Sequence, residues 1–112
     1  MAGVDKRLQV RIAENEALFR EVNEAIERGQ WPGEEDSDTA YRCECARLDC
    51  NQMVSLTPKE YERVRRKPRR FIVLPGHEVS EIATVVASRD GYVVVEKLAE
   101  AGRLAEASDP RS

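Results

Sequence analysis

The chain has 112 residues, which is the length of one domain. Hydrophobic residues make up 41% of it and charged residues 35%, so it is too apolar for a disordered protein and too evenly charged for a membrane protein. It has no run of about 18 apolar residues and no apolar stretch of the signal-peptide type over residues 1–11, so we expect a cytoplasmic protein with no membrane partner.

The first predicted element is a long helix over residues 5–28 that ends at Gly29. Its apolar stripe, with spacings of three and four residues, consists of Leu8, Ile12, Asn15, Phe19, Val22 and Ile26. At 1.5 Å per residue the helix would be about 36 Å long, more than a domain of this size easily covers alone. We therefore expect part of it to dock on a sheet and part, through Leu8, Ile12 and Phe19, on a protein partner or a second copy of the chain.

The charged residues of this helix are expected to face solvent, opposite the apolar stripe. They are Arg11, Glu14, Glu16, Arg20, Glu21, Glu24, Glu27 and Arg28. Asn15 lies within the stripe, where it suits either a register-setting position in a helix dimer or a solvated edge.

An acidic loop that contains proline and glycine is expected over residues 29–40. The zinc-binding core of the single domain is expected over residues 41–97. It begins with two short strands, residues 39–45 and 53–56, which form a hairpin with the cysteines on the turn between them.

A short basic helix is predicted to follow, from Pro58 to Lys67. Thr57 is a good N-cap, Pro58 suits the first helical position, and Glu60 lies where it can complete a capping box. Pro68 ends the helix.

Three further strands are predicted in the second half of the chain. Residues 71–74 form a continuous apolar run of strand type. Residues 82–88 and 92–95 form a hairpin around Asp90 and Gly91. Residues 98–112 are expected to be a C-terminal tail that begins with a short, frayed helix. The predicted fold is α+β, with the long helix packed on a small, mainly antiparallel sheet.

The clearest chemical signal is a group of three cysteines, Cys43, Cys45 and Cys50, followed 27 residues later by His77, the one histidine in the chain. An odd number of thiols cannot pair completely into disulfides, which favours metal ligation. Three thiolates and one imidazole are a standard tetrahedral set for zinc. Aromatic residues are only 5% of the chain, so a metal would help to stabilise a core with few large side chains.

These four residues predict one structural zinc ion, because a complete protein ligand set leaves no position for a substrate. Cysteines can instead be small buried hydrophobic residues. If His77 is only a turn residue, then Glu44, Asp49 or a water could complete the site. Three thiolates would make a zinc-bound water a poor acid, so we expect no enzyme.

A second signal is the charge of residues 59–70. Its seven bases and two acids, Glu60 and Glu62, give a local charge of +5. Because the net charge of the whole chain is −3, the remaining residues together carry −8. The bases are Lys59, Arg63, Arg65, Arg66, Lys67, Arg69 and Arg70. Such a segment could bind an acidic protein or nucleic acid, or could simply be a solvated helix face.

Several segments resemble a group of small uncharacterised bacterial proteins of the high-GC lineage. They are the run NEALFREVNE at residues 15–24, the CEC motif with Cys50, the run LTPKEY at residues 56–61, and the run FIVLPGHE at residues 71–78. The resemblance spans most of residues 11–97 and is weakest at the acidic segment 33–38. It implies a bacterial cytoplasmic domain and carries no activity over to this chain.

Together these observations predict a non-catalytic, zinc-stabilised module for protein binding or regulation. The first alternative is a protein that binds nucleic acid or a transcription complex through residues 59–70. The second is a redox sensor, since zinc thiolates can be oxidised and release their metal.

Overall fold

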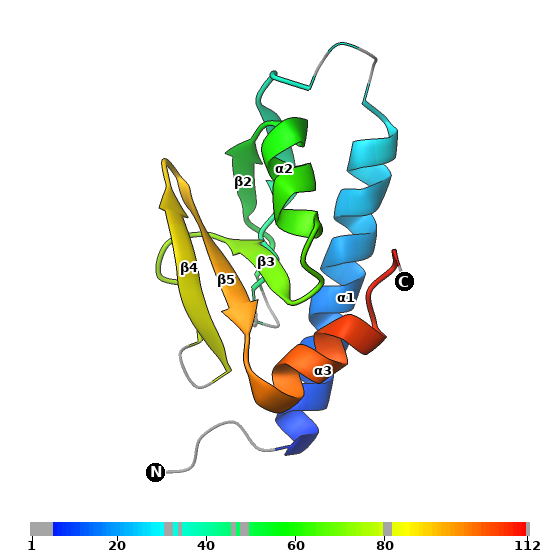
Figure 1. Ribbon diagram of the computed structural model, residues 1–112, viewed down its shortest axis with the longest axis vertical. Coiled ribbons are helices and arrows are strands. Elements are labelled where there is room, and N and C mark those ends of the chain that lie inside the picture. Colours follow the sequence, from blue (N-terminus) through cyan, green and yellow to red (C-terminus); the bar gives the residue numbers. More distant parts are fainter. Residues whose placement is uncertain are drawn as a thin grey trace.

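The computed structural model describes residues 6–30, 33, 35–45, 47, 50–79 and 82–111, and it has the predicted α+β fold. The elements are α1 (Lys6–Arg28), β1 (Thr39–Arg42), β2 (Met53–Leu56), α2 (Pro58–Arg65), β3 (Arg70–Val73), β4 (Ala83–Arg89), β5 (Tyr92–Lys97) and α3 (Ala99–Ala107). The strands form two antiparallel sheets, β1-β2 and β3-β5-β4. Figure 1 shows α1 along one side of the molecule and the larger sheet along the other, with α2 between them at one end and α3 at the other.

Helix α2 begins as its sequence predicts. The Thr57 hydroxyl accepts a hydrogen bond from the Glu60 N–H at 3.1 Å, and the Glu60 carboxylate accepts one from the Thr57 N–H at 2.9 Å. This capping box satisfies two backbone donors that would otherwise lack a partner. It confirms the predicted helix start and fixes the direction in which α2 leaves β2.

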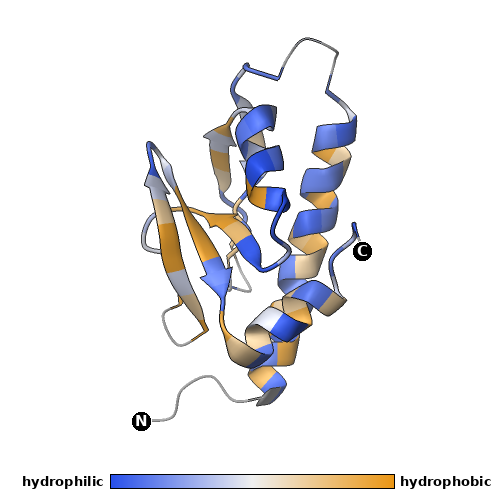
Figure 2. Ribbon diagram, viewed as in Figure 1, coloured by the Kyte–Doolittle hydropathy of each residue, from blue (hydrophilic) through white to orange (hydrophobic). Residues whose placement is uncertain are grey.

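The hairpin of β4 and β5 also forms where the sequence predicts it. Gly91 has a φ of +88°, which glycine adopts without the steric penalty of other residues. Strand β5 lies between β3 and β4, and all its residues from Tyr92 to Val95 are buried. Figure 2 shows the corresponding concentration of hydrophobic residues in β3 and β5.

The main core lies between the larger sheet, the hairpin of β1 and β2, and α2. Tyr41 and Tyr61 are fully buried and their rings stack, with centroids 4.5 Å apart. Phe71 and Ile72 of β3 belong to the same cluster, as do the three cysteines. The metal-ligand candidates are therefore part of the hydrophobic core.

The buried face of α1 differs from the prediction. Ile12 and Phe19 are buried, at 5% and 6% exposure, by contacts within the chain, so the prediction that they bind a partner was wrong. Ile12 packs in a small cluster with Ile82, and Phe19 lies 4.4 Å beneath the Arg42 guanidinium. Leu8 is exposed at 37%.

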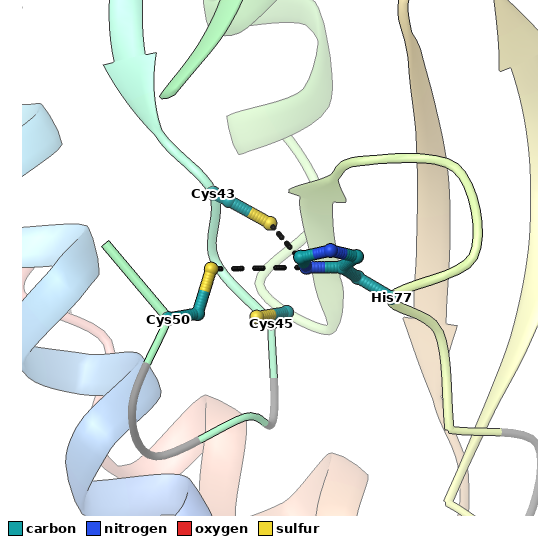
Figure 3. A group of neighbouring side chains, drawn as sticks. All are labelled: Cys43, Cys45, Cys50 and His77. Atoms are coloured by element: carbon teal, nitrogen blue, oxygen red, sulfur yellow. Dashed lines mark hydrogen bonds between the residues drawn. The ribbon is translucent and has the colours of Figure 1, made fainter. Parts of the chain in front are cut away.

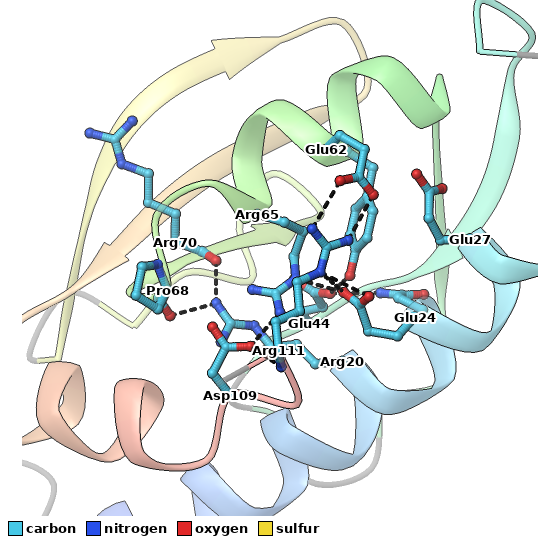
Figure 4. A network of polar contacts seen from close by, with 12 residues as sticks. Arg20, Glu24, Glu27, Glu44, Glu62, Arg65, Pro68, Arg70, Asp109 and Arg111 are labelled. Carbon is cyan, nitrogen blue, oxygen red and sulfur yellow. Dashed lines mark hydrogen bonds and ion pairs between the residues drawn. The ribbon is translucent and has the colours of Figure 1, made fainter.

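Four polar residues of α1 are also buried, namely Glu16, Arg20, Asn23 and Glu24. The prediction that Glu16, Arg20 and Glu24 face solvent was therefore wrong. Each has a partner elsewhere in the chain: Glu16 pairs with Lys97, Glu24 pairs with Arg65 at 2.8 Å, and Arg20 donates to the carbonyls of Pro68 and Arg70. Figure 4 shows how Arg20, Glu24 and their partners meet between α1, α2 and the end of the chain.

The short helix predicted at residues 98–107 forms as α3, but the described residues 98–111 pack on the rest of the chain and do not form a tail. Helix α3 packs against α1, and Asp109 beyond it is buried beside Arg65, at 2.5 Å. Arg111 forms ion pairs with Glu24 and Glu62, at 2.9 and 2.7 Å. These contacts bring the end of the chain onto α1 and α2. Among the described residues, no helix is both long enough and apolar enough to span a bilayer.

Candidate metal centre

The four predicted ligands come from two separate turns. Cys43 and Cys45 directly follow β1, Cys50 precedes β2, and His77 lies in the turn after β3. Backbone hydrogen bonds hold these turns together: the Cys43 N–H donates to the Gln52 carbonyl at 3.0 Å, and the Glu44 N–H donates to the Ile72 carbonyl at 2.7 Å. The second bond ties the cysteine segment to β3, and thus joins the two sheets at the candidate site.

The side chains converge on one point, as Figure 3 shows. One ligand atom from each of the four residues lies within 4.8 Å of the others, an arrangement that could hold one metal ion. The Sγ atoms of Cys43 and Cys50 are each 3.7 Å from His77 Nδ1. Tetrahedral zinc with Zn–S of about 2.3 Å and Zn–N of about 2.0 Å requires a sulfur–nitrogen separation of about 3.6 Å. The observed spacing therefore suits a tetrahedral ion.

Glu44 lies on the opposite face of the chain from its two cysteine neighbours. Side chains alternate in extended backbone, so Cys43 and Cys45 point to the site while Glu44 points into the core. Its carboxylate accepts hydrogen bonds from the Asn23 amide at 2.8 Å, the Tyr61 hydroxyl at 3.1 Å and the Ile72 N–H at 3.1 Å. Glu44 is therefore not the alternative fourth ligand, and the other alternative, Asp49, lies outside the described residues.

The surroundings favour negative charge on at least one sulfur. Hydrogen bonding from the Cys43 thiol, opposed by burial, lowers the pKa of Cys45 to about 5. The same interaction, together with burial, raises the pKa of Cys43. The Leu74 N–H donates to the Cys43 sulfur at 3.2 Å. Such backbone donors stabilise thiolates, and thiolates are the form that binds metal.

The three cysteines of the cluster are buried more deeply than its histidine. The three cysteines are 0%, 1% and 8% exposed, whereas His77 is half-buried. A hollow of about 330 Å³ lies beside His77 and Cys50, and the Arg47 guanidinium at its edge donates to the Gly76 carbonyl at 3.0 Å. The arrangement can hold an ion through four protein atoms, with the imidazole at the solvent side.

The seven bases of the predicted basic segment do not all lie on one surface. Lys59, Arg63, Arg66 and Lys67 are exposed. Arg69 pairs with Glu106 and Arg70 with Glu96, at 3.1 and 3.0 Å. Arg65 is only 3% exposed, so the prediction that it contacts a partner was wrong. It lies on the inner face of α2, where Glu24 and Asp109 neutralise it.

Two candidate surfaces were missed by sequence reasoning. Arg89 at the end of β4 lines a hollow together with Arg63 and Arg70, although it lies outside the predicted basic segment 59–70. An apolar groove lies between α1 and α3, with Leu18 at 55% exposure. Leu18 is apolar and lies beside the predicted stripe. The sequence does not show that the face of α1 that carries Leu18 stays exposed, because this depends on where α3 packs.

Comparison with known proteins gives no relative from which a function could be transferred. No family model, no curated protein and no solved structure matches the chain. A function for this chain therefore has to be inferred from its own site and surfaces.

Proposed function

We propose that this protein is a non-catalytic module that is stabilised by one zinc ion and binds protein through α1 and α3. The observation that carries the proposal is the buried cluster of Cys43, Cys45, Cys50 and His77. Thiolate and imidazole ligands favour zinc over calcium or magnesium, which prefer oxygen. Four protein ligands would complete a tetrahedron, so the ion's role is to fix the two turns to each other.

Native mass spectrometry of reduced protein, purified without a chelator, tests the metal assignment. We expect one zinc per chain and its loss in Cys45→Ser. Glu78→Gln is the control, because Glu78 neighbours His77 but is not one of the four clustered residues, and its carboxylate accepts a hydrogen bond from the Gly76 N–H. Less than half an equivalent of zinc in the wild type, or full zinc in Cys45→Ser, would contradict the assignment.

The alternative role of a zinc-thiolate redox sensor has weaker support. His77 is half-buried and gives an oxidant one approach, but the three sulfurs are almost inaccessible. Oxidation of zinc thiolates requires access to sulfur. Zinc release within minutes under mild peroxide would favour the sensor, whereas retention of zinc supports the structural role.

The binding surface that we propose is the groove between α1 and α3. It has a volume of about 540 Å³, and its apolar lining includes Val10, Ala13, Ala17 and Leu18 of α1 and Leu104 and Ala107 of α3. Val10 and Leu18 are 40% and 55% exposed. A contiguous apolar groove on a small protein is typical of a protein interaction site. This surface replaces the one predicted from Ile12 and Phe19.

The occupant that we propose is a second copy of the chain. The exposed side of α1 carries Arg11 in its N-terminal half and Glu21 in its C-terminal half. In an antiparallel pair of α1 helices centred near residue 16, each Arg11 would face the Glu21 of the other copy. A twofold interface repeats each contact, so both ion pairs form together. The same register places Val10 near the second copy's Val22.

Analytical ultracentrifugation of the zinc-loaded protein tests the dimer. We expect Leu18→Glu to shift the protein to monomer, whereas Leu98→Glu should not, since Leu98 is also exposed, at 41%, but does not line the groove. A wild-type protein that stays monomeric at concentrations of about 100 μM would exclude the second copy as occupant. That outcome leaves the zinc assignment untouched, because the two measurements are independent.

A further inference from the structure

Three arginines from three different elements surround one small hollow. Arg63 comes from α2, Arg70 from β3 and Arg89 from β4. The hollow has a volume of about 70 Å³. Val64, Ala87 and Val94 contribute apolar surface to it, and Glu60 lines it beside the three arginines. Because residues 63 and 89 are far apart in the chain, this grouping is a product of the fold.

The exposed face of α2 extends this basic surface. Lys59 and Arg63 are about one turn apart on α2, Arg66 is the C-cap of this helix, and Lys67 follows it, because the helix ends at Arg65 and not at Lys67 as its sequence predicts. All four are exposed, and within the described part of the chain none has an ion pair. With Arg70 and Arg89 they form a surface that we call the arginine strip.

The acidic groups close to the arginine strip leave an excess of positive charge. Glu96 pairs with Arg70 at 3.0 Å. Glu60 accepts from the Thr57 N–H and, at 3.4 Å, from the Tyr92 hydroxyl. Asp38 and Asp90 line a second hollow, which shares Glu60, Arg89 and Tyr92 with the first. The six bases thus outnumber these four carboxylates, and Arg63 and Arg89 have no carboxylate partner among the described residues.

We propose that the arginine strip binds the phosphate backbone of double-stranded nucleic acid. The hollow would receive one phosphate between Arg63 and Arg89, and Lys59, Arg66 and Lys67 would contact neighbouring phosphates. A series of exposed bases on α2 and in the turn after it matches a polyanion with many charges better than it matches a single acidic side chain. Guanidinium groups are also well suited to phosphate oxygens, because they donate two parallel hydrogen bonds.

The composition of the arginine strip favours duplex over single-stranded nucleic acid. Proteins that bind single strands usually stack bases on exposed aromatic rings. Within the described part of the chain, Tyr92 is the one aromatic residue that lines the hollow, and it is only 3% exposed. Contacts limited to phosphates would give binding that depends on salt and hardly on sequence.

Fluorescence anisotropy with a labelled duplex of about 20 base pairs, as DNA and as RNA, tests the proposal. If about four phosphates are contacted, the affinity should fall roughly 10²-fold between about 50 and 200 mM salt. Arg63→Glu with Arg89→Glu should weaken binding at least tenfold. The control pair is Arg7→Glu with Arg103→Glu, which changes the charge equally at exposed positions outside the arginine strip.

Each outcome decides the proposal. Salt-dependent binding of either duplex that the first pair of substitutions weakens and the control pair does not would support it. No rise in anisotropy at about 50 mM salt would overturn it, as would equal losses in the two pairs. Tighter binding to polyglutamate than to either duplex would also overturn it, and would assign the arginine strip to an acidic protein. Circular dichroism of both variants confirms that they are folded.

Discussion

Replacement of Glu44 by glutamine tests the role of the carboxylate between two metal-ligand candidates. Glu44 is fully buried, and one of its oxygens accepts from Asn23 and Tyr61 while the other accepts from the Ile72 N–H. A glutamine offers one acceptor oxygen and a donor amide. The amide must face a buried donor whichever way the side chain turns. Asn23 cannot reverse its own amide to compensate, because its oxygen accepts from the Arg42 N–H at 2.7 Å.

The expected loss of stability is about 2–4 kcal/mol. A buried donor left without an acceptor costs about 1–3 kcal/mol. The substitution also removes a negative charge that favours the charged form of Arg20, which is 1% exposed. A domain of this size has a free energy of unfolding of about 5–15 kcal/mol, so Glu44→Gln should still fold.

Urea denaturation of the zinc-loaded protein measures this loss, with Glu35→Gln as an exposed control that should stay within about 0.5 kcal/mol of the wild type. A double-mutant cycle with Tyr61→Phe should give a coupling energy of about 0.5–3 kcal/mol with Glu44→Gln. Because Glu44 points away from the metal centre, Glu44→Gln should retain its zinc. A loss of stability below about 0.5 kcal/mol would refute the role of Glu44 as a buried hydrogen-bond acceptor. A loss of zinc from the folded Glu44→Gln protein would refute the conclusion that Glu44 points away from the metal centre.

Three further predictions concern other parts of the fold. Burial raises the pKa of Glu16 to about 7, so between pH 4.5 and 7 the folded protein holds a proton that the unfolded chain releases. The free energy of unfolding should therefore fall by about 1 kcal/mol from pH 6 to pH 8. Chemical denaturation across this range should show that the free energy of unfolding of Glu16→Gln depends less on pH than that of the wild type. Asp109→Ala should cost about 3–5 kcal/mol because it leaves the buried charge of Arg65 with one carboxylate fewer, and a loss under about 1 kcal/mol in urea would contradict that view. Gly91→Ala should lower stability by about 1–2 kcal/mol in thermal unfolding, given the φ of +88°, and an unchanged melting temperature would count against the turn assignment.

The features that could be predicted from the sequence are those set by neighbouring residues. The capping box depends on Thr57 and Glu60, and the hairpin turn depends on Asp90 and Gly91; both are contained in a few positions. The cysteine group was equally local, and only the position of His77 relative to it needed the fold.

The buried face of α1 could not be predicted in the same way. Glu16, Arg20 and Glu24 look like solvent-facing residues because charged side chains are rarely buried without a partner. Their partners are Lys97, Asp109 and Arg65, which lie 41 to 89 positions away in the chain. The periodicity of the helix gives no sign of these distant partners, so the pattern predicted that the charged face is exposed to solvent.

The ion pairs between α1 and the C-terminal part of the chain also bear on how the protein folds. Glu16 and Lys97 are 81 residues apart, and Glu24 and Arg111 are 87 apart. To form contacts between such distant positions, the chain must first lose the conformational entropy of closing a long loop. Proteins rich in such contacts therefore fold slowly. We therefore expect the hairpin of β4 and β5 to form early and α1 to dock last, with refolding rates more sensitive to substitutions in the hairpin than to those in α1.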